Sequence, residues 1–466
     1  MPRFRPRPLT VLVALVLACT GVAQAQVPQV PLNPLRIPKF VEPLPMPLRV
    51  DATTTTPAAP LEISMNEFQQ QLLPASMYAR LPAPFNAGAY LWSYRAAGLP
   101  QTFPGPTLVA KVGVPTSIHY VNNLVGPGGT PPVLQSMVTI DQTLHWADPL
   151  GAMGSTLPYV GPVPAVPHLH GGEVPSAFDG GPDAWWTPGM TQKGHSFVSD
   201  VFTYPNAQQA ATLWYHDHTL GATRTNVYAG LAGFYLLRDP LNEPANLPGG
   251  PGDRATDRYG NPFEREVVLQ DRMFDTNGQI LYPNAGLNPT VHPYWVPEFF
   301  GDCIMVNGKT WPYLQVEPRR YRFRVLNGSN ARFYDLRITD GNNRGGPGMW
   351  QIGSDGGLLD AAVHLQNPRA GRRAAKLILA PGERCDLIVD FSGYAGQTLT
   401  LTNSAMTPFP VGVAVNPRTT GLVMQFRVGR ALRNTAPDAS LNPATQGTML
   451  RATRIERPMV PMAAAR

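Results

Sequence analysis

The stretch RYRFRV, Arg320 to Val325, alternates arginines with apolar side chains. Tyr321, Phe323 and Val325 fall on one face and three arginines on the other, which is the two-residue period of a β-strand. Similar patterning recurs in VGVPTSIHYVNN, REVVLQDRMF, FYDLRITD, CDLIVDF, TLTLTNS and LVMQFRV. No amphipathic helix of crossover length separates these segments, so the pattern excludes a parallel βαβ sheet and favours antiparallel sandwiches.

Composition supports an all-β fold. A chain of 466 residues is long enough for two or three domains. Its 52 prolines and 44 glycines, with only 15% charged residues, indicate short strands joined by turns. The net charge is +6, but the arginines are dispersed and no basic run interleaves with aromatic residues, so we expect no nucleic-acid partner.

The predicted domain order follows from the strand pattern and its interruptions. Residues 26–60 are too rich in proline for a packed core and are predicted to lie extended over the surface. Two β domains are predicted at 61–238 and 255–428, joined by a proline- and glycine-rich linker at 239–254. Residues 429–466 lose strand periodicity and are predicted to be a disordered tail or the start of a third domain.

Residues 1–25 have the features of a secretory signal peptide. Three arginines precede an apolar stretch from Leu9 to Cys19, and an Ala-Gln-Ala cleavage site follows. The mature protein is therefore predicted to be periplasmic or secreted. The alternative is a lipobox ending at Cys19, with the chain anchored to a membrane by an acyl group. No other stretch approaches the roughly 20 apolar residues that span a bilayer.

Two cysteines, Cys303 and Cys385, remain after Cys19 is removed. An oxidising compartment allows a disulfide between them, but spacing alone does not establish one. A disulfide and two buried free thiols both stay open.

Four of the nine histidines form two His-x-His pairs. VPHLHGGE contains His168 and His170, and LWYHDHTLGATR contains His216 and His218. On a strand, residues i and i+2 point to the same face about 6.5 to 7 Å apart. Each pair is therefore suited to bridging two neighbouring metal ions, and neutral imidazole binds copper, zinc, iron or nickel. Ordinary core or surface histidines are the alternative, which two pairs in a histidine-poor chain disfavour.

Two other metal-site families fit the spacing less well. A cupin-type iron site places a glutamate after three or four intervening residues, whereas Glu173 follows His170 after two. An amidohydrolase places its pair at the end of a barrel strand, and the required βα alternation is absent.

Around the histidine pairs the sequence resembles the multicopper oxidase family, in the group of bacterial spore-coat laccase, bilirubin oxidase and phenoxazinone synthase. HLHGGEVPSAFDGGP, YPNAQQAATLWYHDHTLGATR and NVYAGLAGFYLLRDP look like the first cupredoxin domain. FPGPTLVAKVG, VNGKTWPYLQVEPRRYRFRVLNGSN and IGSDGGLL extend the similarity over residues 75–428. The resemblance implies two consecutive cupredoxin-like Greek-key β-sandwich domains.

The resemblance also implies a copper cluster. In that family, three coppers held by eight histidines in four pairs reduce O2 to water. Carried over by motif, His168 would bind the type 2 copper, and His170, His216 and His218 the type 3 pair. Asp179 matches an acid that the family places near the cluster as a proton source; the alternative is a turn aspartate before two glycines.

Half of the family's ligand set has no counterpart in this sequence. The family's third domain carries a His-Pro-x-His-x-His motif and a His-Cys-His-x-x-x-His motif, which also supplies the type 1 copper where electrons enter. Here Cys303 and Cys385 have no histidine neighbours, and the last histidine, His364, stands alone. The second domain instead resembles the family's copper-free middle domain. Four imidazoles leave most positions of three coppers to water, so we expect no laccase turnover from this chain alone.

Three hypotheses follow for the function. The chain is the leading part of an interrupted multicopper oxidase, or a subunit completed by another chain that supplies a third cupredoxin domain. Otherwise it is a non-catalytic periplasmic module that binds copper, or a copper-free structural relative. The retention of all four histidines disfavours the copper-free version. The ancestral chemistry is oxidation of phenolic, bilin-like or metal-ion substrates coupled to reduction of O2.

Overall fold

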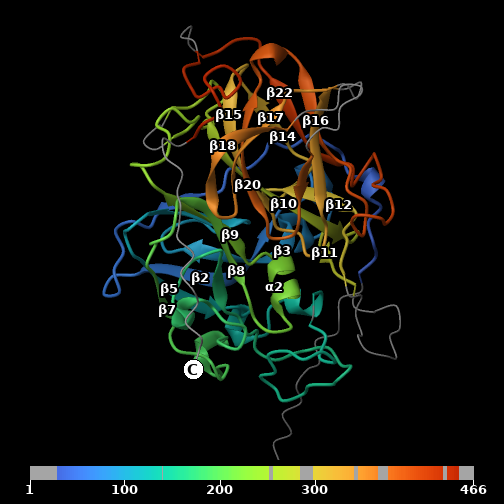
Figure 1. Ribbon diagram of the computed structural model, residues 1–466. Helices are drawn as coiled ribbons and strands as arrows, with labels where there is room; N and C mark the ends of the chain where they lie inside the picture. Colours follow the sequence, from blue (N-terminus) through green and yellow to red (C-terminus); the bar gives the residue numbers. More distant parts are fainter. Residues whose placement is uncertain are drawn as a thin grey trace, which may run out of the picture.

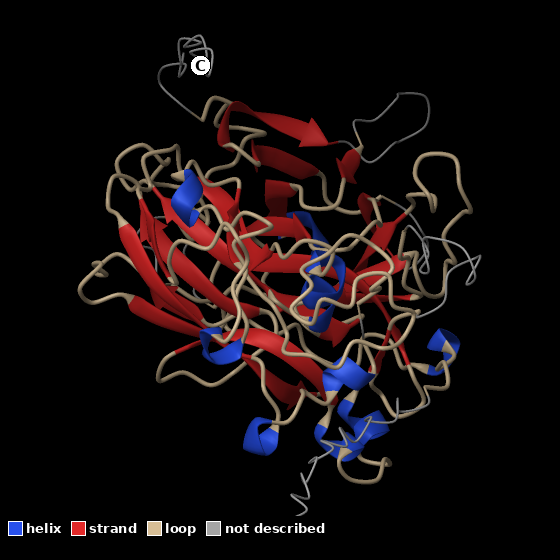
Figure 2. Ribbon diagram, turned by 90° about the horizontal axis from the view of Figure 1, so that it is seen from below, coloured by secondary structure: helices blue, strands red, loops and turns tan. Residues whose placement is uncertain are grey.

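The computed structural model confirms an all-β protein (Figures 1 and 2). It describes residues 29–138, 140–250, 255–283, 298–340, 345–365, 376–433 and 438–450. The predicted signal peptide, 1–25, lies outside these ranges. The described α-helices are α1 (Ala75–Tyr78) and α2 (Thr223–Ala229). Figure 1 shows α2 close to β3 and β8. In these ranges no helix has the length and apolar character that crossing a bilayer requires.

The first sandwich consists of a five-stranded sheet, ordered β1-β4-β9-β8-β6, packed on a four-stranded sheet, ordered β3-β2-β5-β7. The strands are β1 (Arg49–Asp51), β2 (Leu61–Gln70), β3 (Ala89–Ala96), β4 (Gly105–Lys111), β5 (Thr116–Asn123), β6 (Pro167–His170), β7 (Val201–Tyr204), β8 (Ala211–Asp217) and β9 (Ala232–Arg238). Tyrosines pack between the two sheets: the ring centroids of Tyr94 in β3 and Tyr215 in β8 are 4.8 Å apart. The inward face of β8, the second histidine strand, is therefore fixed by the core.

The second sandwich pairs an eight-stranded sheet, ordered β13-β12-β10-β15-β20-β17-β18 with β11 beside β10, with a five-stranded sheet, ordered β14-β22-β21-β16-β19. The first sheet contains β10 (Glu264–Phe274), β11 (Ile280–Leu281), β12 (Cys303–Val306), β13 (Lys309–Thr310), β15 (Arg320–Asn327), β17 (Met349–Ser354), β18 (Gly357–Leu365) and β20 (Arg384–Asp390). The second contains β14 (Tyr313–Val316), β16 (Tyr334–Asp340), β19 (Leu377–Leu379), β21 (Thr398–Asn403) and β22 (Leu422–Val428). Phe323 and Phe426 meet between the sheets with ring centroids 5.6 Å apart.

Most neighbouring strands are antiparallel, as expected, but each sandwich also contains parallel pairs. Neighbouring strands run parallel in the pairs β1–β4, β4–β9, β2–β5, β10–β15 and β14–β22. The reason is that the chain crosses to the opposite sheet between the members of each pair and returns in the same direction. A parallel neighbour therefore needs no helical crossover.

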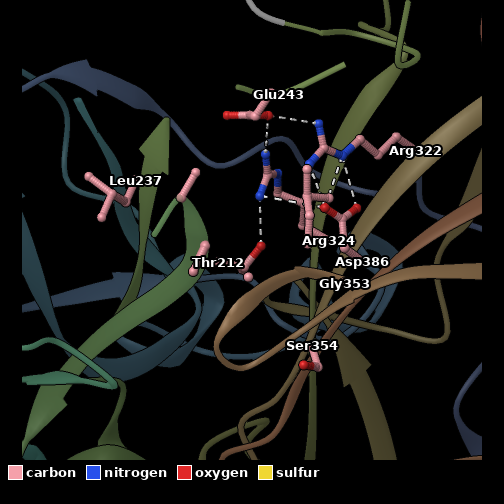
Figure 3. A pocket seen from close by; sticks show the side chains of 12 residues that line it. Thr212, Leu237, Glu243, Arg322, Arg324, Gly353, Ser354 and Asp386 are labelled. Carbon is pink, nitrogen blue, oxygen red and sulfur yellow. Dashed lines mark hydrogen bonds and ion pairs between the residues drawn. The ribbon is translucent and has the colours of Figure 1, made fainter. Parts of the chain in front are cut away.

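Both faces of β15 are buried, although its sequence alternates arginine with apolar residues. Tyr321 and Phe323 lie in the core, and Arg322 and Arg324 are only 1% and 2% exposed. On the arginine face, Arg322 pairs with Asp386 of β20 and Arg324 with Glu264 of β10, both buried (Figure 3 labels Asp386). Arg324 also donates to Thr212 of β8 in the first sandwich. The alternation therefore marks a face buried between the two sandwiches rather than a face toward solvent.

The flanking segments pack on the sandwiches. In the segment predicted to be extended, Leu44 N donates to Tyr313 O at 2.7 Å, and β1 pairs with β4. Residues 438–450 fall in the region predicted to be disordered or to begin a third domain, yet they lie against β18. There Ala362 N donates to Thr448 O at 2.7 Å, and Leu441 is buried. The expectation of disorder does not hold for these residues; residues 451–466 lie outside the described ranges.

Candidate metal centre

The register between β6 and β8 brings the two histidine pairs together. In this antiparallel pair His168 lies opposite His216, and His170 lies opposite Trp214. Residues opposite one another share a face, as do alternate residues along a strand. Three imidazoles and the Trp214 indole therefore lie on one face, while Leu169 packs in the core on the other.

The ligand nitrogens of the histidines converge. One ligand atom from each of His168, His170 and His216 lies within 4.8 Å of the others. His170 Nδ1 and His216 Nε2 are 3.1 Å apart. Two nitrogens bound to one ion at about 2.0 Å with a tetrahedral angle lie roughly 3.3 Å apart, so these two atoms can bind the same ion.

His218, just beyond the end of β8, completes the group. Its ring stacks on that of His168 with centroids 4.6 Å apart. The structure thus gathers all four histidines that the sequence singled out. Within the described ranges, no other set of His, Cys, Asp and Glu side chains shows the convergence of His168, His170 and His216.

Main-chain carbonyls orient three of the four imidazoles through Nδ1. The pairs are His168 with Asp179 O, His216 with Asp217 O at 2.7 Å, and His218 with Gly180 O at 3.2 Å. Donation to a carbonyl requires the proton to be on Nδ1, which leaves Nε2 unprotonated and free for a metal. A second bond of this kind is a regular feature of histidines that bind metal ions.

Burial favours the neutral form of His170, His216 and His218. Desolvation, with the charge of Arg384 adding to it, lowers the pKa of His170 to about 4. Desolvation also holds the pKa of His216 well below its ordinary value and lowers that of His218. Neutral imidazole is the form that binds a metal, so these side chains are ready as ligands at neutral pH.

Asp217 holds the backbone that presents the histidines. Its carboxylate is fully buried and points away from the cluster. It accepts hydrogen bonds from Val166 N at 3.0 Å, from Thr219 N at 3.1 Å and from Asn226 Nδ2 at 3.0 Å. These bonds tie the start of β6, the turn after His218 and helix α2 together.

Gly180 lets the loop that carries Asp179 approach the histidines. Its φ is +70°, and a Cβ built there would lie 2.0 Å from Pro167 O. Any side chain would therefore push the loop away from β6. The close approach lets Gly180 O reach His218 and Asp179 O reach His168.

The structure places Asp179 beside the cluster. One of its carboxylate oxygens lies 3.3 Å from His168 Nδ1, and the side chain is 45% exposed. The carboxyl group therefore connects the histidine cluster to solvent. Its main-chain oxygen has the separate task of orienting His168.

Trp214 also borders the site, although its sequence motif gave it no role. Its ring centroid lies 4.1 Å from that of His216 and 5.1 Å from that of His170. Its position two residues before His216 was the available signal, because alternate residues share a strand face.

The remaining candidate groups lie apart from the cluster. Cys303 and Cys385 are buried free thiols, so no disulfide joins them. Burial raises the pKa of both thiols well above the ordinary value. His364, in β18, stacks on Trp350 with ring centroids 4.4 Å apart.

Comparison with known proteins shows extensive similarity. A family model described as multicopper oxidase matches residues 163–242. The chain is 38% identical over 402 residues to a laccase of Bacillus subtilis (strain 168), covering 85% of this chain and 67% of the laccase. It is 36% identical over 387 residues to multicopper oxidase LPR1 homolog 1 of Oryza sativa subsp. japonica, covering 83% of this chain and 57% of that relative.

Solved structures share the fold. The McoA multicopper oxidase of Aquifex aeolicus superposes with a TM-score of 0.58 at 23% identity, over 89% of this chain and 69% of that one. A multicopper oxidase of Campylobacter jejuni, described as a metallo-oxidase, has a TM-score of 0.58 at 18% identity, over 92% of this chain and 68% of that one. The expected cupredoxin-like sandwiches are thus confirmed.

Proposed function

Because the chain belongs to the multicopper oxidase family, we propose that its two His-x-His pairs bind copper in a laccase-like oxidase. The observation that carries the proposal is the convergence of His168, His170 and His216, with His218 stacked beside them. Neutral nitrogen donors without a thiolate or a dominant carboxylate suit copper, so the donor set fits the metal that the family implies.

The proposed distribution of ligands follows the family motif, and one distance supports it. His170 Nδ1 and His216 Nε2 are 3.1 Å apart and are assigned to one ion of the type 3 pair. His218 is assigned to the other ion of that pair, and His168 to the type 2 position. When bound, the copper ions supply the electron-transfer chemistry that reduces O2.

The protein residues hold the ligands and handle protons. Three imidazoles donate hydrogen bonds from Nδ1 to main-chain carbonyls. The proton therefore stays on Nδ1, and the Nε2 lone pair is available to the metal. We assign Asp179 as the proton source, because its carboxyl group touches His168 and is open to solvent.

The four histidines are half of the ligand set that the family uses. We propose that the other half and the electron-entry copper come from a third cupredoxin domain outside the residues described here, whether on this protein or on a partner chain. The reducing substrate is proposed to be a phenol, a bilin-like compound or a metal ion. With residues 1–25 as a signal peptide, the protein would act in the periplasm or outside the cell; acylation at Cys19 is the alternative.

A second candidate function is a non-catalytic copper-binding module. It is favoured by the two cysteines, which are buried as neutral thiols away from the histidine cluster. Such a module would bind copper through the same histidines without a route for electrons from a substrate.

Copper uptake tests the proposal. The double variant His216→Ala, His218→Ala should lose most of the copper that the purified protein retains after dialysis, with an unchanged circular dichroism spectrum. His364→Ala is the matched control, because His364 lies on β18 away from the cluster, and it should keep wild-type uptake. Equal uptake by all three proteins would reject the copper site.

Addition of a third cupredoxin domain separates the two functions. A chain that carries a His-Cys-His-x-x-x-His motif, co-expressed with this one, should produce blue absorption and O2 consumption with a phenolic substrate. A copper-loaded but colourless and inactive mixture would favour the module.

A further inference from the structure

Arg384 of the second sandwich reaches the strand pair that carries the histidines. Arg384, at the start of β20, is 4% exposed. Its Nε donates to Thr212 O at 2.9 Å, its Nη1 to Gly382 O at 2.9 Å and its Nη2 to Asp355 O at 3.3 Å. One planar guanidinium thus connects strand β8 to two turns of the second sandwich.

The same guanidinium lies against the end of β6. Gly171 follows His170 directly, and a Cβ built on it would lie 2.5 Å from Arg384 Nη2. The absence of a side chain at Gly171 is what lets the guanidinium approach. Arg384 therefore contacts both histidine strands, β6 through Gly171 and β8 through Thr212.

The turn before Arg384 covers the His170 ring. A Cβ built on Gly382 would lie 3.3 Å from His170 Cε1, so this main chain packs directly on the imidazole. Arg384 fixes that turn through its bond to Gly382 O. The copper-free sandwich thus forms part of the wall around a metal ligand.

A second arginine holds the same strand without touching the histidines. Arg324 Nη1 donates to Thr212 Oγ1 at 2.8 Å, and Arg324 belongs to the buried charge cluster drawn in Figure 3. In that cluster Arg322 pairs with Asp386, and Glu243 accepts from Arg322. The Arg324 bond to Thr212 joins the two sandwiches, whereas of these two arginines it is Arg384 that also approaches Gly171.

We propose that Arg384 is a positioning residue for the metal centre. It sets the relative placement of the ends of β6 and β8, so that His170 and His216 direct their nitrogens at one ion. This inference rests on the proposed copper function. Metal sites require ligands held within about 0.5 Å, and a guanidinium with fixed donors meets this need where a flexible ammonium does not.

Arg384→Lys tests the inference against a matched control. Arg238→Lys is the control, because Arg238 pairs with Glu264 between the same two sandwiches, and its guanidinium contacts found in the described residues go to Glu264 and Glu243 rather than to β6 or β8. The measurements are the Cu(II) affinity by competition with a chelator, the electron paramagnetic resonance spectrum of the loaded protein, and the melting midpoint of the metal-free protein. Arg384→Lys should lose about tenfold or more in affinity and change the spectrum. Arg238→Lys should keep both while its melting midpoint falls.

Wild-type affinity and spectrum in Arg384→Lys would overturn the inference, as would losses of copper by both variants in proportion to their melting midpoints. Failure of the wild-type chain to bind Cu(II) would instead reject the proposed function. If Arg384→Lys does not fold, Asp355→Asn serves in its place. Asp355 is 49% exposed and pairs with Arg384 at 3.3 Å, so its substitution weakens the anchor with little cost to the fold. A smaller loss of affinity supports the inference, and no loss overturns it.

Discussion

His170 Nδ1 and His216 Nε2 lie 3.1 Å apart although 46 positions separate the two residues in the chain. The pairing of β6 with β8 produces this distance, because it sets His168 opposite His216 and His170 opposite Trp214. A shift of register by one residue would turn one pair into the core, because alternate residues point to opposite faces. The metal centre therefore depends on strand register as much as on the histidines themselves.

Asp179→Asn should retain copper but slow O2 reduction in the completed oxidase. The amide cannot release a proton, so a role as proton source predicts a loss of roughly 100-fold or more in turnover. Its main-chain bond to His168 is unaffected, so copper content should match wild type. Stopped-flow reoxidation of the reduced enzyme measures the step. Normal reoxidation with normal copper would leave Asp179 with only its role in the turn.

Trp214→Ala should destabilise the first sandwich by about 3 to 5 kcal/mol, the usual cost of removing a buried aromatic side chain. The indole fills the space between the two imidazoles and the second sandwich, so the variant should also lose copper affinity. Trp214→Phe keeps most of the packing and should retain the copper. Urea unfolding and copper titration of both variants are the measurements, and a stable, copper-replete Trp214→Ala would contradict the packing role.

Asp217→Ala should lower the free energy of unfolding by about 3 kcal/mol or more, because four donor groups lose their buried acceptor. Differential scanning calorimetry of the metal-free protein measures the change. Asp217→Asn keeps one oxygen acceptor and should lose less. Equal melting midpoints for the alanine variant and wild type would show that water replaces the carboxylate.

The metal-free protein should lose stability on acidification from about pH 6.5 to pH 4. The pKa of His170 is lowered to about 4 and that of His216 is also lowered in the fold. In this window the unfolded chain binds protons that the folded chain does not, so stability falls as pH falls. The buried His216 contributes at most about 1.4 kcal/mol per pH unit.

Urea unfolding at pH 7, 6, 5 and 4 measures this dependence. His216→Ala with His218→Ala should make the pH dependence weaker, because these two groups then no longer take up protons on unfolding, while His170 still does. The same slope in this variant and in wild type would assign the pH dependence to other residues.

The local parts of the site could be predicted from the sequence because a strand has a period of two. Two His-x-His pairs at this spacing indicated that imidazoles share a face, and the structure brings them together. Trp214 could have been added by the same rule. The role of Asp179 as a proton source could be predicted only from the family resemblance. An aspartate that merely forms a turn before glycine has the same local sequence.

Long-range contacts could not be predicted from local sequence periodicity. Arg384 and Thr212 are 172 positions apart, and nothing in their neighbouring residues marks them as partners. The arginines of RYRFRV show the same limit: alternation predicted the strand, but only the packing of the sandwiches showed that its polar face is buried.

Strand identity, the shared face of each histidine pair and the all-β class thus came from local periodicity, because backbone geometry fixes where neighbouring side chains point. The register of β6 on β8, the buried arginines and the contact of Arg384 with Gly171 were decided by tertiary packing. Those contacts depend on which distant segments bury apolar surface against each other. This is determined by the packing of the whole chain and not by any single stretch of sequence.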